Sequence, residues 1–284
     1  MRLESWRESD LIYGRKFGLA LTMEVFRAAD ANGAAVLWVV SNSGRSSREL
    51  TLQPSFERRI SRLVERGYTV FAVIHGSAPG FHILDQIGDV RRAVRFTRWG
   101  ARSYGIDPER IGLSGASAGG ALALSVAMQA APGDAAAADP VERMSAGVQA
   151  VGCFFAPTDF ANFGESGEHV VDYMQRRYGV VDPSFQFPFE DDRLIDLLRE
   201  SSPITHAGPA SPPTLLIHGS ADTVVPPGQA ARLVERLTQH GVASRLVLRQ
   251  DASHGWPGWD DDVALIADWF DEHLLGRGLE DRTW

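Results

Sequence analysis

Apolar residues come in short continuous runs that alternate along the chain with segments of helical periodicity. Each run has the length expected of a strand that is covered on both faces. The runs lie at residues 34–40, 68–74, 110–114, 148–155, 214–218 and 244–248. The helical segments lie at residues 55–66, 85–104, 119–130, 227–240 and 260–275. Strands separated by helices of this length form βαβ units, so the pattern predicts an α/β protein whose mostly parallel central sheet has helices on both faces.

Two segments depart from this alternation. Residues 12–17 and 19–26 pivot on Gly18, and we expect them to pair as antiparallel strands at the sheet edge. Residues 160–208 are long and mixed in character, and an insertion of this size in an α/β domain is typical of a cap. The sequence contains no internal repeat and no Gly/Ser-rich linker. We therefore interpret residues 1–284 as a single domain with a cap-like insertion at about residues 160–208.

Composition and charge exclude several classes of protein. Of the 284 residues 44% are hydrophobic and 23% charged, which excludes a disordered chain and a fibre. No apolar run approaches 18 residues and the first residues lack an apolar signal region, so we expect a cytoplasmic protein without a membrane partner. The net charge of −8 argues against a nucleic-acid partner. Cys153 is the only cysteine, which excludes an internal disulfide and a cysteine-built metal site.

A Gly-x-Ser-x-Gly motif at residues 115–119 indicates a serine nucleophile. The motif directly follows a predicted strand and directly precedes a helix of small residues, which is the setting of a nucleophile elbow. Such a turn projects the hydroxyl of Ser117 above the sheet, and the small flanking residues let strand and helix approach closely. An ordinary glycine-rich turn between a strand and a helix is the alternative interpretation.

A serine nucleophile needs a base, and the base needs an acid that fixes its tautomer. Asp222 and His254 each follow a predicted strand, and the chain order Ser117, Asp222, His254 is the order that this kind of elbow protein uses. Because carboxyl ends of parallel strands meet at one sheet edge, we expect the three side chains to converge. Asp251 is a rival acid that we expect to act only locally, and His218 is interpreted as structural.

The negative oxygen formed during acyl transfer requires N–H donors. One predicted donor is the backbone N–H of Ala118, directly after the nucleophile. The second is expected in the loop after the strand at residues 34–40, where Asn42 or Ser43 can expose an amide. Two further side chains are candidate substrate-binding residues: His75, at the end of the strand at residues 68–74, and Trp256, just past the predicted base. Trp259 is a further candidate. The alternative role is packing for the two tryptophans and a structural role for His75.

With these residues in place, the sequence resembles an α/β-hydrolase of the bacterial feruloyl-esterase-like (BD-FAE) group of the esterase/lipase superfamily. The resemblance runs from residues 13–18 to the His254 loop and is most specific at the elbow and the acid loop. Members of the group usually carry a Gly-Gly sequence in the oxyanion loop, where this chain has Ser41-Asn42-Ser43-Gly44.

This resemblance implies an α/β-hydrolase fold and a serine carboxylesterase that acts without a metal or organic cofactor. Its expected partners are small-molecule or oligosaccharide esters with acyl or hydroxycinnamoyl groups. The alternatives are a catalytically silent hydrolase-fold binding protein and a prolyl-oligopeptidase-like peptidase, although the latter usually carries an additional large domain. The sequence does not define the oligomeric state.

Overall fold

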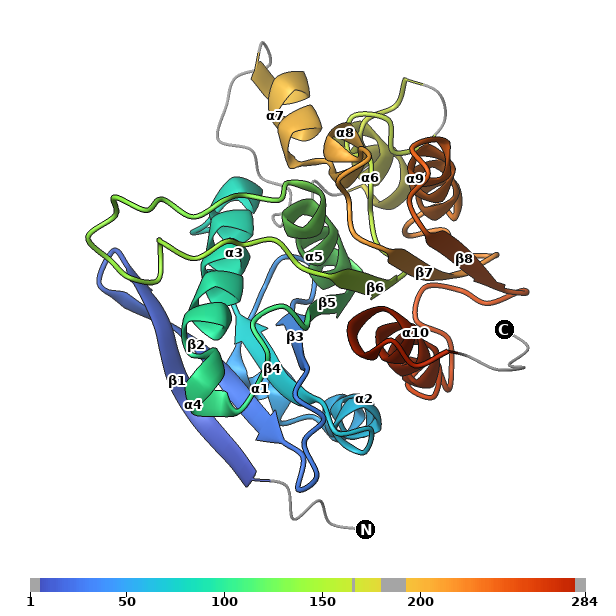
Figure 1. Cartoon of the computed structure of the whole chain (residues 1–284). Coiled ribbons are helices and arrows are strands. Elements are labelled where there is room, and N and C mark those ends of the chain that lie inside the picture. Colours follow the sequence, from blue (N-terminus) through green and yellow to red (C-terminus); the bar gives the residue numbers. More distant parts are fainter. Residues whose placement is uncertain (1–5, 165–166, 180–192, 279–284) are drawn as a thin grey trace.

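The fold is built on one twisted sheet that runs through the middle of the molecule (Figure 1). The structure is a computed structural model and describes residues 6–164, 167–179 and 193–278. In this part of the chain eight strands form a single sheet in the order β1-β2-β4-β3-β5-β6-β7-β8. The strands are β1 (Trp6–Lys16), β2 (Leu19–Arg27), β3 (Ala35–Val40), β4 (Thr69–Ile74), β5 (Ile111–Ala116), β6 (Ala150–Phe154), β7 (Thr214–Gly219) and β8 (Ser244–Arg249). β1 and β2 are antiparallel to their neighbours and the other strands pair in parallel, as the sequence predicts.

Helices cover both faces of the sheet (Figure 1). They are α1 (Arg48–Thr51), α2 (Pro54–Val64), α3 (Ile83–Trp99), α4 (Ala101–Tyr104), α5 (Ala118–Met128), α6 (Val170–Tyr178), α7 (Leu194–Ser201), α8 (Pro203–His206), α9 (Gly228–Gln239) and α10 (Val263–Leu275). α2 and α10 pack on one face, and α3, α5 and α9 pack on the other. No helix in the described ranges has both the length and the apolar character needed to cross a membrane.

The apolar runs are continuous because each central strand buries side chains on both faces. In β3, Leu37 and Val39 pack under α3 and α5, whereas Val36 and Trp38 pack against the layer of α2 and α10. Burial of one such side chain stabilises the fold by about 1.5–3 kcal/mol relative to its exposure. Packing on both faces therefore holds the strands in place, and with them the carboxyl ends from which the candidate catalytic side chains project.

The starts of two helices differ from the sequence prediction by two residues or more. α3 begins at Ile83, two residues early, and Asp85 caps it from the third helical position by accepting the His82 N–H (3.1 Å). Similarly, α10 begins only at Val263, so the three aspartates at residues 260–262, which the predicted helix at residues 260–275 included, lie before it. Their carboxylates pair instead with arginines of α2 and β8. In both places side-chain pairing defines the boundary more sharply than apolar periodicity does.

The segment at residues 160–208 contributes three helices, α6, α7 and α8, to its described part. Residues 165–166 and 180–192 of this segment lie outside the described residues, so its role as a cap stays a prediction. The hydroxyl of Tyr173 in α6 donates to the carbonyl of Thr223 (2.6 Å), and that of Tyr178 donates to the same oxygen (3.1 Å). The inserted helix α6 therefore contacts the loop that carries Asp222.

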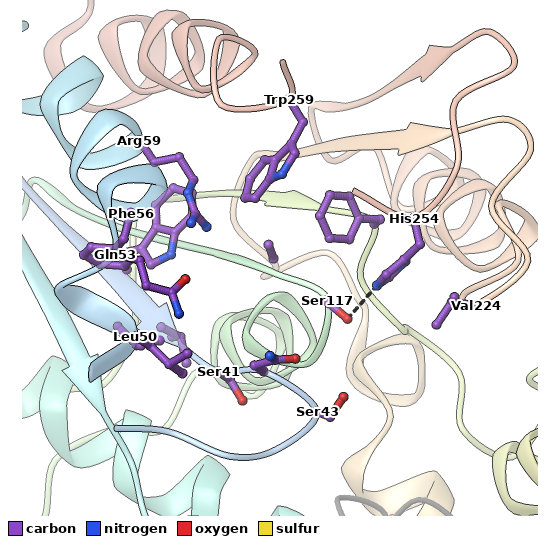
Figure 2. A pocket seen from close by; sticks show the side chains of 16 residues that line it. Ser41, Ser43, Leu50, Gln53, Phe56, Arg59, Ser117, Val224, His254 and Trp259 are labelled. Atoms are coloured by element: carbon purple, nitrogen blue, oxygen red, sulfur yellow. Dashed lines mark hydrogen bonds between the residues drawn. The ribbon is translucent and has the colours of Figure 1, made fainter. Parts of the chain in front are cut away.

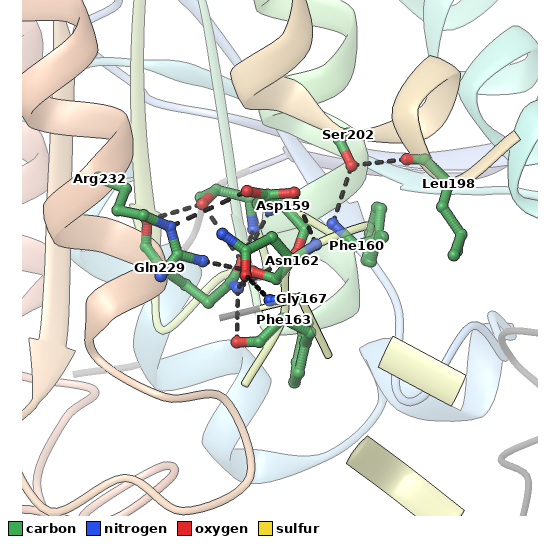
Figure 3. A network of polar contacts seen from close by, with 10 residues as sticks. Asp159, Phe160, Asn162, Phe163, Gly167, Leu198, Ser202, Gln229 and Arg232 are labelled. Carbon is green, nitrogen blue, oxygen red and sulfur yellow. Dashed lines mark hydrogen bonds and ion pairs between the residues drawn. The ribbon is translucent and has the colours of Figure 1, made fainter. Parts of the chain in front are cut away.

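A buried amide side chain ties the loop after β6 to the start of α9 (Figure 3). The Gln229 Oε1 atom accepts the backbone N–H groups of Thr158 (2.8 Å) and Asp159 (2.7 Å). Its Nε2 atom donates to the carbonyls of Asp159 (3.1 Å), Asn162 (3.1 Å) and Phe163 (2.9 Å). Gln229 is completely buried, so these bonds satisfy groups that have no access to solvent. The loop between β7 and α9 is anchored at its far end by this contact.

Candidate active site

Ser117 lies in a sharp turn between β5 and α5. Its backbone has φ 52° and ψ −124°, a left-handed conformation that is strained for a residue with a side chain. The turn is possible because glycines stand where the chain crosses itself most closely: a Cβ atom on Gly115 would lie 2.6 Å from the backbone of Gly119, and one on Gly119 would lie 2.4 Å from the carbonyl oxygen of Val39. The Ser117 N–H donates to the carbonyl of Phe154 (3.0 Å), which fixes the turn against β6.

The three predicted side chains meet at the carboxyl ends of β5, β7 and β8. The Nε2 atom of His254 lies 3.0 Å from the Oγ atom of Ser117 (Figure 2), and its Nδ1 atom lies 2.7 Å from the Oδ2 atom of Asp222. With the imidazole proton on Nδ1, His254 donates to the carboxylate and accepts the serine proton. The ring of Phe155 packs edge-on against the imidazole, with 4.6 Å between ring centroids. These contacts define the orientation of the base.

Asp222 is held as a carboxylate by donors on all sides. Its Oδ1 atom accepts the N–H groups of Val224 (2.9 Å) and Val225 (3.0 Å), and its Oδ2 atom lies 3.2 Å from the Nε2 atom of His218. Burial raises the pKa of Asp222, but the hydrogen bonds from His218, His254 and the backbone outweigh burial and leave that pKa well below its usual value. The carboxylate is therefore ionised at neutral pH.

The rival acid lies elsewhere. Asp251 is exposed, and its Oδ1 atom accepts a hydrogen bond from the side chain of Gln250 (3.0 Å) rather than from His254. His218, which the sequence suggested to be only structural, is fully buried beside Asp222, and its Nε2 atom also lies 2.9 Å from the carbonyl oxygen of Val225. Its position four residues before Asp222 in the same motif is the signal that sequence reasoning could have used.

The loop after β3 lies beside the elbow because β3 pairs directly with β5. In this loop the N–H of Asn42 donates to the carbonyl of Arg45 (2.8 Å), closing a turn whose central residues, Ser43 and Gly44, have φ values of 48° and 71°. The backbone N–H of Asn42 is thus engaged, whereas that of Ser43 donates to no residue in the described ranges. Ala118 is the first residue of α5, so its N–H has no partner within the helix.

His75 lies one strand farther from the nucleophile, at the end of β4. Only 3% of its surface is exposed, and its Nδ1 atom lies 2.8 Å from the carbonyl oxygen of Gly76. Burial, assisted by the nearby charge of Lys16, lowers the pKa of His75 to about 4. The residue does not line the cavity at Ser117, so its position lends no support to the predicted role in substrate binding.

A cavity of about 310 Å³ opens beside Ser117 and His254. Its walls combine aliphatic and polar residues with the aromatic side chains of Trp38, Phe56, Phe155 and Trp259. Trp256 is not among the residues that line it: this side chain is 9% exposed, packs behind Phe155 and donates through Nε1 to Asp262 (3.1 Å). Of the two tryptophans considered in the sequence, the structure therefore places Trp259 at the cavity.

The cavity wall opposite Ser117 contains two polar residues that sequence reasoning missed, Gln53 and Arg59 (Figure 2). The side chain of Arg59 is only 14% exposed, and its guanidinium lies 4.6 Å from the centroid of the Trp259 ring. Arg59 lies three residues after the buried Phe56 and four before the buried Leu63, at the edge of the apolar face, whereas Arg58 has neither spacing; this spacing is a signal that sequence reasoning could have used. In the described part of the chain no group of three His, Cys, Asp or Glu side chains could hold a metal ion.

Comparisons with known proteins identify both the fold and the family. A family model described as BD-FAE matches residues 26–237. The chain is 27% identical over 242 residues to the probable carboxylic ester hydrolase LipM of Mycobacterium tuberculosis, covering 82% of this chain and 52% of that protein. Its identity to the esterase LipC of the same organism is 31% over 179 residues, with 63% and 42% of the two chains covered. The chain thus spans about half the length of the curated relatives it matches.

Solved structures resemble the whole described architecture. A truncated carbohydrate esterase from gut microbiota superposes with a TM-score of 0.76 at 23% identity, covering 95% of this chain and 97% of that one. An acetyl ester-xyloside bifunctional hydrolase from Caldicellulosiruptor lactoaceticus gives a TM-score of 0.76 at 21% identity, with 93% and 96% covered. These similarities establish an α/β-hydrolase fold. Because the family model extends over most of the sequence, the chain belongs to the BD-FAE family.

Proposed function

We propose that this protein is a serine carboxylesterase that hydrolyses carboxylic esters through Ser117, His254 and Asp222. The observation that carries the proposal is the continuous hydrogen-bonded series from the hydroxyl to the imidazole (3.0 Å) and from the imidazole to the carboxylate (2.7 Å). Relatives named as esterases support the same reaction class. A catalytically silent binding protein has no need of a strained serine facing an oriented histidine, and no observation favours that alternative or a peptidase.

In the first half of the reaction, Ser117 Oγ attacks the ester carbonyl carbon while His254 Nε2 takes its proton. The carbonyl oxygen becomes an oxyanion, and we expect the N–H groups of Ala118 and Ser43 to donate to it. Asp222 stabilises the imidazolium that forms. Collapse of the tetrahedral intermediate breaks the bond to the alcohol oxygen, which receives the proton from His254, and leaves an acyl-enzyme on Ser117.

In the second half, the same groups act on water. His254 removes a proton from a water molecule, and the oxygen attacks the acyl carbon to form a second tetrahedral intermediate. This intermediate expels Ser117 Oγ, which regains its proton from His254, and the carboxylic acid leaves. The original Ser117 proton leaves on the alcohol and Ser117 ends with a proton from water, so both side chains regain their starting protonation states without a metal or an organic cofactor.

The cavity supports a substrate with an acyl or hydroxycinnamoyl group. Its volume of about 310 Å³ and the aromatic and aliphatic side chains in its walls suit a planar or short apolar group. Edge-on contacts link Trp259 with Phe154 (5.0 Å) and Phe155 (5.3 Å), which gives the wall a fixed shape for such a ring. Small-molecule or oligosaccharide esters are the proposed partners.

Hydrolysis of p-nitrophenyl acetate tests the proposal. Wild-type protein should release p-nitrophenolate with turnover, and Ser117→Ala should abolish that release. Ser125→Ala is a matched control, because Ser125 lies in α5 and is fully buried away from the cavity. Equal rates for wild type and Ser117→Ala would contradict the proposed reaction.

A further inference from the structure

The cavity wall formed by α2 lies opposite the nucleophile and carries a charged side chain. Figure 2 shows Arg59 and Gln53 on one side of the cavity and the Ser117–His254 pair on the other. The mechanism uses neither of these polar residues. A substrate group that extends from the scissile ester across the cavity therefore ends near a guanidinium.

Arg59 is held in place before any ligand binds. Its Nε atom donates to the carbonyl of Ser55 (2.9 Å) and lies 3.1 Å from the Oδ1 atom of Asp260. Its Nη2 atom donates to the Ser55 hydroxyl (3.2 Å), and the rings of Phe56 and Trp259 flank the guanidinium at 5.6 Å and 4.6 Å. Its Nη1 atom donates to no residue in the described ranges. A guanidinium fixed in this way loses little rotamer entropy when an acceptor binds.

The charges at the wall favour an anionic group. None of the described residues that line the cavity is an aspartate or a glutamate, whereas Arg59 is a permanent cation. Asp260, the acid that pairs with Arg59, lies outside the cavity lining and is shared with Arg58, whose Nη2 atom lies 3.2 Å from its Oδ2 atom. Asp260 therefore does not fully neutralise the two guanidiniums. In a protein with a net charge of −8, a cavity with this positive wall is a local exception.

We propose that Arg59 is a specificity-determining residue and that the site takes esters whose far end carries a carboxylate, such as monoesters of dicarboxylic acids. The apolar walls would contact the spacer between the ester and the acid, and Arg59, with Gln53 beside it, would bind the carboxylate. This inference rests on the proposed esterase function and adds a substrate class to it. Removal of a charge-assisted hydrogen bond of this kind changes kcat/KM by about tenfold or more.

Paired substrates test the inference. One series contains monomethyl esters of straight-chain dicarboxylic acids from succinate to suberate, compared with methyl esters of monocarboxylic acids of matched length. A second pair, 4-carboxyphenyl acetate and 4-methylphenyl acetate, places the charge on the alcohol side. At the best-fitting length we expect wild type to have a higher kcat/KM for the acid-bearing ester than for its neutral partner. Arg59→Met should lower kcat/KM for the acid-bearing ester about tenfold and change kcat/KM for the neutral ester less than about threefold.

Arg62→Met is the matched control, because Arg62 lies on the same helix, is 47% exposed, pairs with Asp261 (2.6 Å) rather than with Asp260, and does not line the cavity. It should leave both kinds of ester unaffected, and Arg59→Lys should retain part of the preference. If Arg59→Met does not fold, the wild-type preference and its reduction in Arg59→Lys decide the question. The inference would be overturned if Arg59→Met lowered kcat/KM equally for charged and neutral esters, or if wild type favoured the neutral ester of every pair. Either result would leave the proposed esterase function standing. If the protein hydrolyses neither series, that result contradicts the proposed function and this inference with it.

Discussion

Replacement of Gln229 by leucine tests whether the buried amide in Figure 3 stabilises the framework of the site. Leucine has a similar volume but no polar atoms, so the change removes hydrogen bonds without creating a large cavity. Two backbone N–H groups, those of Thr158 and Asp159, would lose their acceptor, and the carbonyls of Asp159 and Phe163 would lose a donor. The Asn162 carbonyl would lose one of its two donors and keep Arg232 Nη2. These groups lie around a side chain with no solvent exposure.

The expected effect follows from the number of buried groups left without a partner. Each unsatisfied buried group costs about 1–3 kcal/mol, and local relaxation recovers part of the total, so we expect Gln229→Leu to lower the free energy of unfolding by about 3–5 kcal/mol. For a chain of this size about 1 kcal/mol corresponds to 2–4 °C in Tm, so the melting temperature should fall by about 6–20 °C.

Thermal unfolding followed by circular dichroism, together with urea unfolding, measures both quantities. Gln239→Leu is the matched control, because Gln239 lies on the same helix but is exposed and bonds only to Glu235 (3.4 Å). That variant should change Tm by less than about 2 °C. A Gln229→Leu protein as stable as the control would refute the view that this amide anchors the loop.

Three further predictions concern the acid and the buried histidines. Asp222→Asn should lower kcat by about 10⁴-fold, because His254 loses the acceptor that fixes its tautomer, whereas Asp251→Asn should leave kcat nearly unchanged; the reverse order would identify Asp251 as the acid. His218→Leu should lower kcat about tenfold at unchanged KM, with partial recovery in His218→Gln, since one hydrogen bond to Asp222 is lost; a change confined to KM would argue against this positioning role. His75, with a pKa lowered to about 4 in the folded state, binds a proton more readily when unfolded, so its contribution to stability falls as the pH drops from about 6.5 towards 4. Between pH 7.5 and pH 5, wild type should therefore lose about 2 kcal/mol more unfolding free energy than His75→Gln in urea titrations, and parallel losses would contradict a buried neutral imidazole.

The main elements of the fold and the convergence of the three proposed catalytic side chains could be predicted because short-range patterns encode them. Buried strands read as continuous apolar runs, and the carboxyl ends of parallel strands share one edge, so Ser117, Asp222 and His254 could be brought together before any coordinates were considered. The strand order explains why the loop with Ser43, rather than the one with His75, lies beside the elbow.

The cavity wall could not be predicted in the same way. Helical spacing places Arg59 beside the apolar face of α2, but its place in the cavity wall depends on the packing of Trp259 and Asp260, which come from the loop before α10. The choice between Trp256 and Trp259 likewise depends on how that loop turns, because the residues lie only three positions apart. The engagement of the Asn42 N–H by Arg45 depends on turn geometry that residue types permit but do not specify.

Covalent labelling with paraoxon, a phosphate triester that phosphorylates activated serines, tests most directly whether folding creates a nucleophile at the elbow. Peptide mass spectrometry should locate one diethylphosphoryl group per chain on Ser117, with release of one equivalent of p-nitrophenolate. Labelling should be absent in Ser117→Ala and slowed by several orders of magnitude in His254→Ala. Labelling at another residue, or an equal rate in wild type and His254→Ala, would contradict the account that His254 activates Ser117.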